Sequence, residues 1–440
     1  MNILLFTGSL GINDKGHLEI GKLDTTTLIK EFGSPLWIID EEGLRENCRS
    51  FKNAFTKWGN TEVTYASKSL SNLSILRIID EEGLSLDVVS GGELYTALSA
   101  NFPPEKIYFH GNNKSVAELT YALESKVARI VVDNFYELEI LNGIAKGLGK
   151  SADIILRITP GVEANTHEYI KTGQIDAKFG FTLPDGDAIR AAKAAIDYPY
   201  LNLKGIHCHI GSQIFDSEGF VVATSLMLDL VSTIKRETGH ECSELDVGGG
   251  FGIYYTEGDE PLSADKWAEA IMTTVGKECA KNNLTVPKII IEPGRAISGP
   301  AGITLYTIGS YKEVKGIRKY IAIDGGMTDN LRPALYGAKY AALIANKARE
   351  KPDELVTVAG KCCESGDILI EDIYLPKPEP NDILAVFATG AYNYAMASNY
   401  NRLPKPAMLL VQNGQADIIV KRETYEDLVR NDLIPERLRK

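Results

Sequence analysis

The chain has 440 residues, 44% of them hydrophobic and 24% charged, with a formal net charge of −12. This length predicts two or three domains with a sizeable core, and the acidic balance argues against a nucleic-acid partner, which would need clustered Lys and Arg. Because the six cysteines lack the spacing of a disulfide scaffold and no apolar run is long enough for a membrane span or follows the basic segment of a signal peptide, we expect a cytoplasmic protein without a membrane partner.

Eight apolar, β-rich runs alternate with helix-like segments through the first two thirds of the chain. They begin at Thr61, Ser85, Lys106, Ala128, Asp153, Leu203, Glu244 and Lys288. The segments between them, such as 116–125, have apolar residues at three- and four-residue spacing, which is typical of helices. Continuous apolar strands alternating with helices predict a parallel sheet covered on both faces. Eight units over about 250 residues match an α/β fold, the (β/α)8 TIM-type barrel, which we expect at residues 36–298.

After about Ser298 the pattern changes to short strand-like runs separated by Gly, Pro and Asn, with few long helices. The clearest runs are 302–314, 319–326, 355–360 and 407–413. This pattern predicts a second, mostly antiparallel β domain. We expect residues 299–440 to form it together with 1–35, which contain similar short pieces.

Polar residues occupy the predicted carboxyl ends of the barrel strands, where the chemistry of this fold lies. They are Lys68, Asp87, His110, Asp133, Arg157, His209 and Glu292. Each alone has an ordinary structural explanation, since a lysine there is often only solvated and an aspartate is often a helix N-cap. The whole set favours an active site at this end of the barrel.

Glycine-containing turns follow the seventh and eighth expected strands. Gly248, Gly249 and Gly250 follow the seventh, and EPGR, residues 292–295, follows the eighth. Successive glycines let backbone N–H groups face one anion, and these loops are the usual phosphate site of the fold; a tight turn without a ligand is the alternative. A lysine at the end of the first strand can form a Schiff base. Together these features favour pyridoxal 5′-phosphate as the cofactor.

Eight motifs, in this order, resemble the fold-type III pyridoxal-phosphate-dependent decarboxylases. They are YASKS, DVVSGGEL, HCHIGSQI, DVGGGFGIYY, EPGR, DGGMTDNLRPALYGA, CESGD and GAYNYAMASNYN. The resemblance covers nearly the whole chain and is greatest to the members that act on diaminopimelate. It implies decarboxylation of meso-2,6-diaminopimelate to L-lysine and CO2, the last step of lysine biosynthesis.

The resemblance implies a set of cofactor-binding residues. Lys68 would form the Schiff base, and His209 would stack on the ring. The other cofactor contacts would come from Asp87, Ser212, Gly248, Gly249, Gly250, Gly294, Arg295 and Tyr392. Glu292 has a clear physical role, because an ionised carboxylate beside the pyridine nitrogen keeps that nitrogen protonated and makes the ring a strong electron sink. A helix N-cap is the structural alternative for Glu292.

A metal site is the other chemistry that the histidines suggest. His207 and His209 are two residues apart on one face of the sixth expected strand, where two imidazoles could bind zinc. No third ligand lies nearby in the sequence, so we expect no metal.

The resemblance also assigns the end of the substrate that is not cleaved. Arg295, Arg332 and Tyr336 would bind its carboxylate, since a guanidinium matches a carboxylate bidentately. Glu364 would face its ammonium, and Tyr392 would also contact the substrate. A surface ion pair is the ordinary alternative for Arg332.

Two adjacent cysteines, Cys362 and Cys363, precede Glu364. The family pattern makes Cys363 the acid that protonates the substrate carbon after CO2 leaves, and it makes Cys362 a packing residue. A disulfide between them would be strained. Lys361 stands where we expect a small or apolar residue, and a nearby cation favours the thiolate. The resemblance further implies a homodimer in which the β domain supplies substrate and interface residues and this segment completes the partner's active site.

Two other functions remain open from the sequence. One is decarboxylation of a related basic amino acid or a carboxylated polyamine, although ornithine or arginine would not need an arginine clamp for a distal carboxylate. The other is a cofactor-binding regulator without activity, against which the intact Lys68, Glu292 and Cys363 argue.

Overall fold

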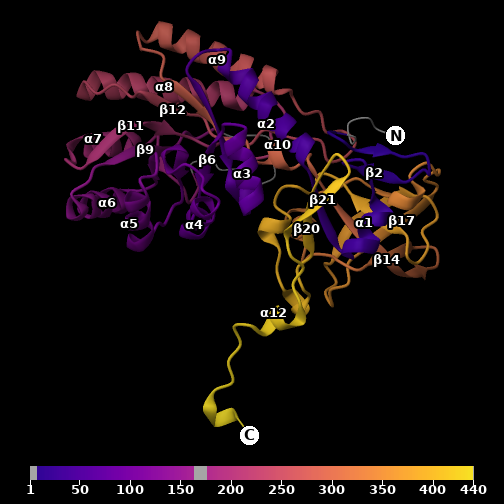
Figure 1. Ribbon diagram of the computed structural model, residues 1–440. Helices are drawn as coiled ribbons and strands as arrows, with labels where there is room; N and C mark the ends of the chain where they lie inside the picture. Colours follow the sequence, from indigo (N-terminus) through magenta and orange to yellow (C-terminus); the bar gives the residue numbers. More distant parts are fainter. Residues whose placement is uncertain (1–6, 163–175, 440) are drawn as a thin grey trace. The chain divides into compact units, whose positions relative to one another are not determined.

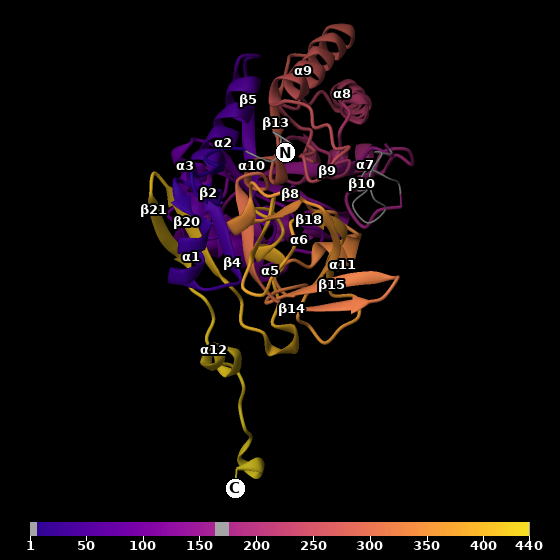
Figure 2. The same cartoon turned by 90° about the vertical axis from the view of Figure 1, so that its right-hand side faces the viewer.

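The computed structural model describes residues 7–162 and 176–439, which form two compact units (Figures 1 and 2). The β unit comprises Met1–Leu44, Tyr255–Glu257 and Ser298–Lys440, and the barrel unit comprises Arg45–Tyr254 and Gly258–Ile297. Within the described ranges, no helix is both long and apolar enough to cross a membrane.

The barrel unit contains a closed parallel β-barrel. Its strands are β5 (Thr61–Ala66), β6 (Ser85–Val88), β7 (Ile107–Phe109), β8 (Arg129–Val132), β9 (Ala152–Thr159), β11 (Leu201–His207), β12 (Glu244–Asp246) and β13 (Lys288–Ile291). Neighbours pair in parallel around the ring, and β13 pairs with β5 to close it. A short extra strand, β10 (Phe181–Thr182), pairs with β9. The predicted (β/α)8 TIM-type barrel is confirmed.

Helices alternate with these strands along the chain (Figure 1). They are α3 (Leu73–Glu81), α4 (Gly91–Ser99), α5 (Val116–Ser125), α6 (Phe135–Leu148), α7 (Asp187–Asp197), α8 (Glu218–Thr238) and α9 (Ala264–Lys281). Several begin directly after the mouth of the barrel at a capping side chain: Asn72, Ser90 and Asn134 each accept a hydrogen bond from an N–H of the first turn. Such caps satisfy N–H groups that a helix start leaves unpaired, so the chain can turn sharply and leave the strand-end residues at the mouth.

The β unit contains a mostly antiparallel sheet, as predicted. Its strands are β4 (Leu36–Asp40), β14 (Gly302–Val314), β15 (Arg318–Ile323), β16 (Ala342–Ile344), β17 (Glu354–Ala359), β18 (Ile368–Leu375), β19 (Ile383–Val386), β20 (Ala407–Gln412) and β21 (Gln415–Val420). Only the pairings of β15 with β17 and of β20 with β4 are parallel among the described pairs of this sheet. A small sheet of β1 (Gly11–Ile12), β2 (Leu18–Ile20) and β3 (Leu23–Asp24), followed by α1 (Thr25–Phe32), comes from the N-terminal segment.

Strand β4 belongs to the β unit. All five of its residues are buried, and it lies between β14 and β20, so both of its edges are used in that sheet. The sequence-based boundary at residue 36 assigned this strand to the barrel domain, whereas the compact units divide inside α2 (Glu41–Thr56), between Leu44 and Arg45. A short apolar run such as LWIID does not indicate which sheet it will join.

Candidate active site

The polar residues predicted at strand ends lie at the carboxyl ends of the barrel strands. Lys68 is in the 3-10 turn after β5, Asp87 is in β6, and His110, Asp133 and Glu292 directly follow β7, β8 and β13. Lys68 is exposed, whereas Asp87 and Glu292 are buried. Lys68 lowers the pKa of both Asp87 and His209 through its charge, although burial is the largest influence on each pKa. The lysine therefore lies at the mouth, beside the carboxylate and the imidazole that the sequence placed there.

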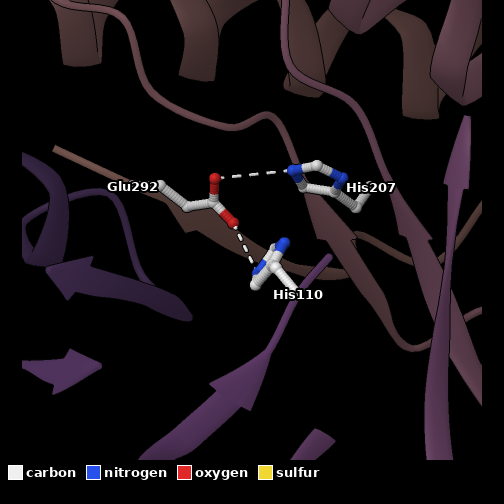
Figure 3. A group of neighbouring side chains, drawn as sticks. All are labelled: His110, His207 and Glu292. Atoms are coloured by element: carbon white, nitrogen blue, oxygen red, sulfur yellow. Dashed lines mark ion pairs between the residues drawn. The ribbon is translucent and has the colours of Figure 1, made fainter. Parts of the chain in front are cut away.

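Glu292 faces two imidazoles (Figure 3). Its Oε1 lies 3.0 Å from Nε2 of His110, and its Oε2 lies 3.4 Å from Nε2 of His207. The three side chains are at most 5% exposed, and the two imidazole rings meet edge to face with centroids 5.0 Å apart. The carboxylate is thus held between groups from β7 and β11, far from it in the sequence.

The charge state of this group follows from burial and from its neighbours. Burial works to raise the pKa of Glu292, but His110 and His207 outweigh it and hold that pKa well below its usual range. Burial lowers the pKa of His207 to about 4 and raises the pKa of Asp87 to about 6. Near neutral pH, Glu292 is therefore an ionised carboxylate beside a neutral imidazole.

Several buried polar atoms in this region have no hydrogen-bond partner among the described residues. They are Nε2 of His110, both ring nitrogens of His207, Oε1 of Glu292 and Oδ1 of Asp87. The imidazole contacts of Glu292 are thus close in distance but lack the alignment of hydrogen bonds. Because leaving a buried polar group unsatisfied costs about 1–3 kcal/mol, such atoms mark a place for a polar ligand. A protonated pyridine nitrogen fits a carboxylate in this state.

The glycine turn after β12 allows close approach of the backbone. A Cβ atom at Gly249 would lie 2.0 Å from the carbonyl oxygen of Glu292, and one at Gly250 would lie 2.2 Å from that of Gly211. No side chain fits at either position, so the turn packs directly against the loops after β11 and β13. Gly248 has φ +71° and also abuts a carbonyl, that of Cys208, at 2.4 Å from its Cβ position. The turn is therefore defined by backbone packing that only glycine allows, and the N–H groups of Gly248 and Gly249 donate to Asp246 and His209.

The turn also orients His209. The N–H of Gly249 donates to Nδ1 of His209 over 3.2 Å, which places the ring proton on Nε2 when the ring is neutral. Burial, together with Lys68 and Arg157, holds the pKa of His209 well below its usual range. His209 is therefore a neutral ring, which suits stacking on an aromatic cofactor.

The remaining predicted phosphate contacts lie together. Nη2 of Arg295 donates to Oγ of Ser212 over 3.0 Å, which joins the loops after β11 and β13. A Cβ atom at Gly294 would lie 2.9 Å from Cβ of Ala66, so this glycine permits close packing beside the turn that holds Lys68. Arg295 is buried, and its positive charge suits a phosphate.

Asp133 and Arg157 make contacts with other residues of the barrel unit. Oδ1 of Asp133 accepts a hydrogen bond from the N–H of Gly180 over 3.0 Å, and the Arg157 guanidinium lies over the ring of Phe179 at 4.2 Å from its centroid. These contacts order the segment that follows residue 175.

Arg332 of the β unit is a buried cation at the start of α11 (Arg332–Tyr336). Its Nη1 donates to the hydroxyl of Tyr340 over 2.5 Å, and its guanidinium lies 5.0 Å from the ring centroid of Tyr255. No carboxylate among the described residues forms an ion pair with it, so the surface-pair alternative does not apply. Because a buried charge without a counter-ion is costly, this arrangement favours an anionic ligand.

Two other predicted substrate residues of the β unit are Tyr336 and Tyr392. Tyr336 is four residues from Arg332 on α11, on the same helix face. Burial works to lower the pKa of Arg332, but its tyrosine neighbours Tyr255, Tyr340 and Tyr392 outweigh it and raise that pKa. Tyr392 has φ +62°, a conformation that non-glycine residues adopt mainly where the surroundings enforce it.

The cysteine pair occupies the loop between β17 and β18. Cys362 is buried, its N–H donates to Oδ2 of Asp367 over 2.9 Å, and burial followed by Asp367 raises its pKa to about 12. Cys363 is exposed, and its N–H donates to Oδ1 of Asn401 over 2.7 Å. Glu364 is also exposed. One thiol is therefore inert and packed, and its neighbour is open to solvent.

Sequence reasoning missed two parts of this region. Asp246 is fully buried in β12, with Oδ1 accepting from the N–H of Gly248 over 2.8 Å, and the only local signal was an acidic residue inside a short apolar strand. The zinc alternative paired His207 with His209, whereas the structure brings His207 together with His110 and Glu292, whose ligand atoms lie within 4.8 Å of one another. Contacts between distant strands leave no local pattern.

Comparisons with known proteins match this geometry. The model for the pyridoxal binding domain of pyridoxal-dependent decarboxylases matches residues 41–299. The diaminopimelate decarboxylase of Bacillus subtilis is 53% identical over 96% of this chain and 96% of its own length, and that of Staphylococcus aureus is 43% identical over 96% and 98%.

Solved structures agree over nearly the whole chain. The diaminopimelate decarboxylase of M. jannaschii, in complex with L-lysine, has a TM-score of 0.92 at 37% identity, covering 98% of this chain and 99% of its own. The enzyme of Helicobacter pylori, also complexed with L-lysine, has a TM-score of 0.84 at 32% identity, covering 92% and 98%. The chain therefore belongs to the diaminopimelate decarboxylases, within the pyridoxal-dependent decarboxylase family.

Proposed function

We propose that this chain catalyses the pyridoxal-phosphate-dependent decarboxylation of meso-2,6-diaminopimelate to L-lysine and CO2. Family membership supports the reaction, and two relatives bind L-lysine, the proposed product. The observation that carries the choice of substrate is Arg332, a buried cation with no acidic partner among the described residues. A substrate with a carboxylate at its distal end would supply that partner, whereas ornithine and arginine lack one.

The barrel residues would hold the cofactor. Lys68 would form the covalent link to its aldehyde, and Ser212, Arg295 and the three glycines of residues 248–250 would bind its phosphate. His209 would lie against the ring, and Glu292 would keep the ring nitrogen protonated. When bound, pyridoxal phosphate accepts the electron pair that CO2 leaves behind at Cα.

The β-unit residues would bind the distal end of the substrate and donate a proton to Cα. Arg332 and Tyr336 would bind the carboxylate at the end that is kept, and Glu364 would face the ammonium there. The thiol of Cys363 would give a proton to Cα after decarboxylation. Its exposure leaves it accessible to a substrate, unlike that of Cys362.

We also propose that the enzyme is a homodimer whose active sites combine residues of both subunits. The exposed Cys363 and Glu364 support this, because an acid and a substrate ligand need a surrounding surface to exclude water. A cytoplasmic location fits the six free thiols, which are typical of a reducing compartment.

Mixing two inactive variants tests the shared site. Lys68→Ala and Cys363→Ala protein are dissociated together and reassociated. With shared sites, half of the dimers are hybrids and one of the two sites in each is intact, so about one quarter of the wild-type activity returns. If the mixture stays inactive while a sedimentation measurement shows hybrids, each site is built from a single chain.

The reaction itself is tested by measuring CO2 release from meso-diaminopimelate with and without added pyridoxal phosphate. Ornithine and arginine serve as matched controls that lack the distal carboxylate. We expect turnover of diaminopimelate alone, with L-lysine formed in equal amount. Turnover of the control substrates at a comparable rate would contradict the proposed specificity.

A further inference from the structure

Three buried ionisable side chains from three barrel strands lie around the carboxylate of a fourth residue, Glu292. His110 follows β7, His207 ends β11, Asp246 ends β12 and Glu292 follows β13. Figure 3 shows the two imidazoles directed at different oxygens of Glu292. Asp87 and Arg157 act on the same group through their charges, from β6 and β9.

A gain in stability is a poor explanation for this cluster. Replacing buried charged and polar groups with apolar residues of similar size is often neutral or stabilising, and the orphaned nitrogens of His110 and His207 add to the cost of burial. The group is therefore better explained by what it does to Glu292.

The carboxylates of Asp246 and Glu292 differ in charge state. Burial, followed by the charge of Glu292 and a side-chain hydrogen bond to it, raises the pKa of Asp246 well above its usual range. An ionised Oδ2 of Asp246 would have no donor to face among the described residues. A proton on Oδ2 turns the contact into a hydrogen bond donated to Glu292, while Oδ1 keeps its bond from the N–H of Gly248.

We propose that His110, His207 and Asp246 are positioning residues that fix the charge and direction of Glu292, and through it the protonation of the cofactor's ring nitrogen. The inference rests on the proposed function in placing that nitrogen at Glu292. Each oxygen of Glu292 faces one imidazole, and Asp246 approaches from the neighbouring strand β12. The carboxylate accordingly keeps lone pairs for one further donor.

The nitrogen-15 resonance of labelled pyridoxal phosphate in the holoenzyme measures ring protonation directly. His207→Phe keeps the ring volume and removes both ring nitrogens, whereas His207→Gln retains a polar N–H near the Nε2 position; the same pair is made at His110. We expect the Phe variants to shift the resonance toward the unprotonated value and to weaken cofactor binding by the apoenzyme about tenfold. The Gln variants should restore both.

Asp246→Asn tests the proton on Asp246. Asparagine keeps an oxygen for the N–H of Gly248 and offers an N–H where the acid offers O–H, so the resonance and its pH titration should match those of the wild type. If Asp246 were ionised, this substitution would remove a charge beside Glu292 and the titration would move. Such a shift would overturn the role given to Asp246, and this isosteric variant is informative even if a His207→Phe protein fails to fold.

Glu292→Gln distinguishes the positioning role of His110 and His207 from the placement of the ring nitrogen at Glu292. Loss of ring protonation in Glu292→Gln but not in either Phe variant would overturn the positioning role alone. A protonated signal that survives in Glu292→Gln would refute the placement of the ring nitrogen in the proposed function, and the inference with it.

Discussion

The two ends of the barrel treat their charges in opposite ways. At the amino ends of the strands, Lys288 lies 2.7 Å from Glu62 and 3.0 Å from Glu244. Arg129 binds Glu244 bidentately, over 2.8 and 2.6 Å, and also approaches Asp153 at 3.5 Å. Each of these charges has a partner of opposite sign. At the carboxyl ends, buried groups retain atoms without hydrogen bonds among the described residues.

The pKa values show the same contrast. Burial works to raise the pKa of Glu244, but Arg129 and Lys288 outweigh it and lower that pKa. At the mouth, burial is the largest cause of the raised pKa values of Asp87 and Asp246, and the charge of Glu292 raises both further. The amino-terminal end is thus arranged to stabilise the barrel. At the carboxyl-terminal end, polar groups are buried at a cost in free energy, and a bound ligand can reduce that cost.

Lys68→Ala should have the largest effect on activity. Because Lys68 is exposed, its removal should change the free energy of unfolding far less than it changes turnover, which falls by several orders of magnitude without the covalent link. The measurements are CO2 release and the long-wavelength absorbance that an imine of this cofactor gives the holoenzyme. Retained absorbance would contradict the role of Lys68.

Arg332→Ala should lower kcat/KM for diaminopimelate by about 100- to 1000-fold, because it leaves the distal carboxylate without its partner. Arg318→Ala is the matched control, since Arg318 pairs with Glu371 at the surface of the same unit and should change kcat/KM little. Equal effects of the two substitutions on kcat/KM would show that Arg332 has no special part in substrate binding.

Glu244→Gln should lower the free energy of unfolding by about 1–3 kcal/mol, because Arg129 loses its bidentate partner and Lys288 keeps only Glu62. The loss should be greatest near neutral pH. A lowered folded-state pKa contributes stability above the unfolded-state pKa, and that contribution is lost as the pH falls through the folded-state value. Urea unfolding at several pH values is the measurement, and an unchanged KM should accompany it.

Asp87→Asn should show the opposite pH response. The pKa of Asp87 is raised from 3.8 to about 6, so its favourable contribution is complete below the unfolded-state pKa and is lost as the pH rises through the folded-state value. The variant should therefore gain stability relative to the wild type between these values, by roughly 3 kcal/mol at most. If both variants respond to pH with the same sign, the contrast between the two ends is wrong.

The fold could be predicted where the signal was local. The eight barrel strands are buried apolar runs, and several of the helices that follow begin at a capping residue such as Asn72, Ser90 or Asn134. Both features are readable in the chain. Strand β4 was misassigned because its four apolar residues, Leu36 to Ile39, fit either sheet equally well. The hydrophobic pattern of a strand indicates that it is buried, but it does not indicate which strand it will pair with.

The residues of the candidate site also fall into those that local motifs predict and those that depend on distant contacts. Lys68, Glu292 and the glycine turn stand in compact motifs, so their positions followed from the strand ends. The approach of His110 to Glu292 and the aromatic surroundings of Arg332 depend on pairing between distant segments. The protonation of Asp246 depends on burial as well as on such a neighbour, and neither is written in its local sequence.

The difference in exposure between Cys363 and the other five cysteines determines which thiol reacts with electrophiles. All five others are buried, whereas Cys363 is exposed. Alkylating agents and peroxides reach exposed thiols first, so each chain presents a single chemical target. Oxidative damage would begin at the residue proposed to deliver the proton, and a covalent label would report on that residue without unfolding the protein.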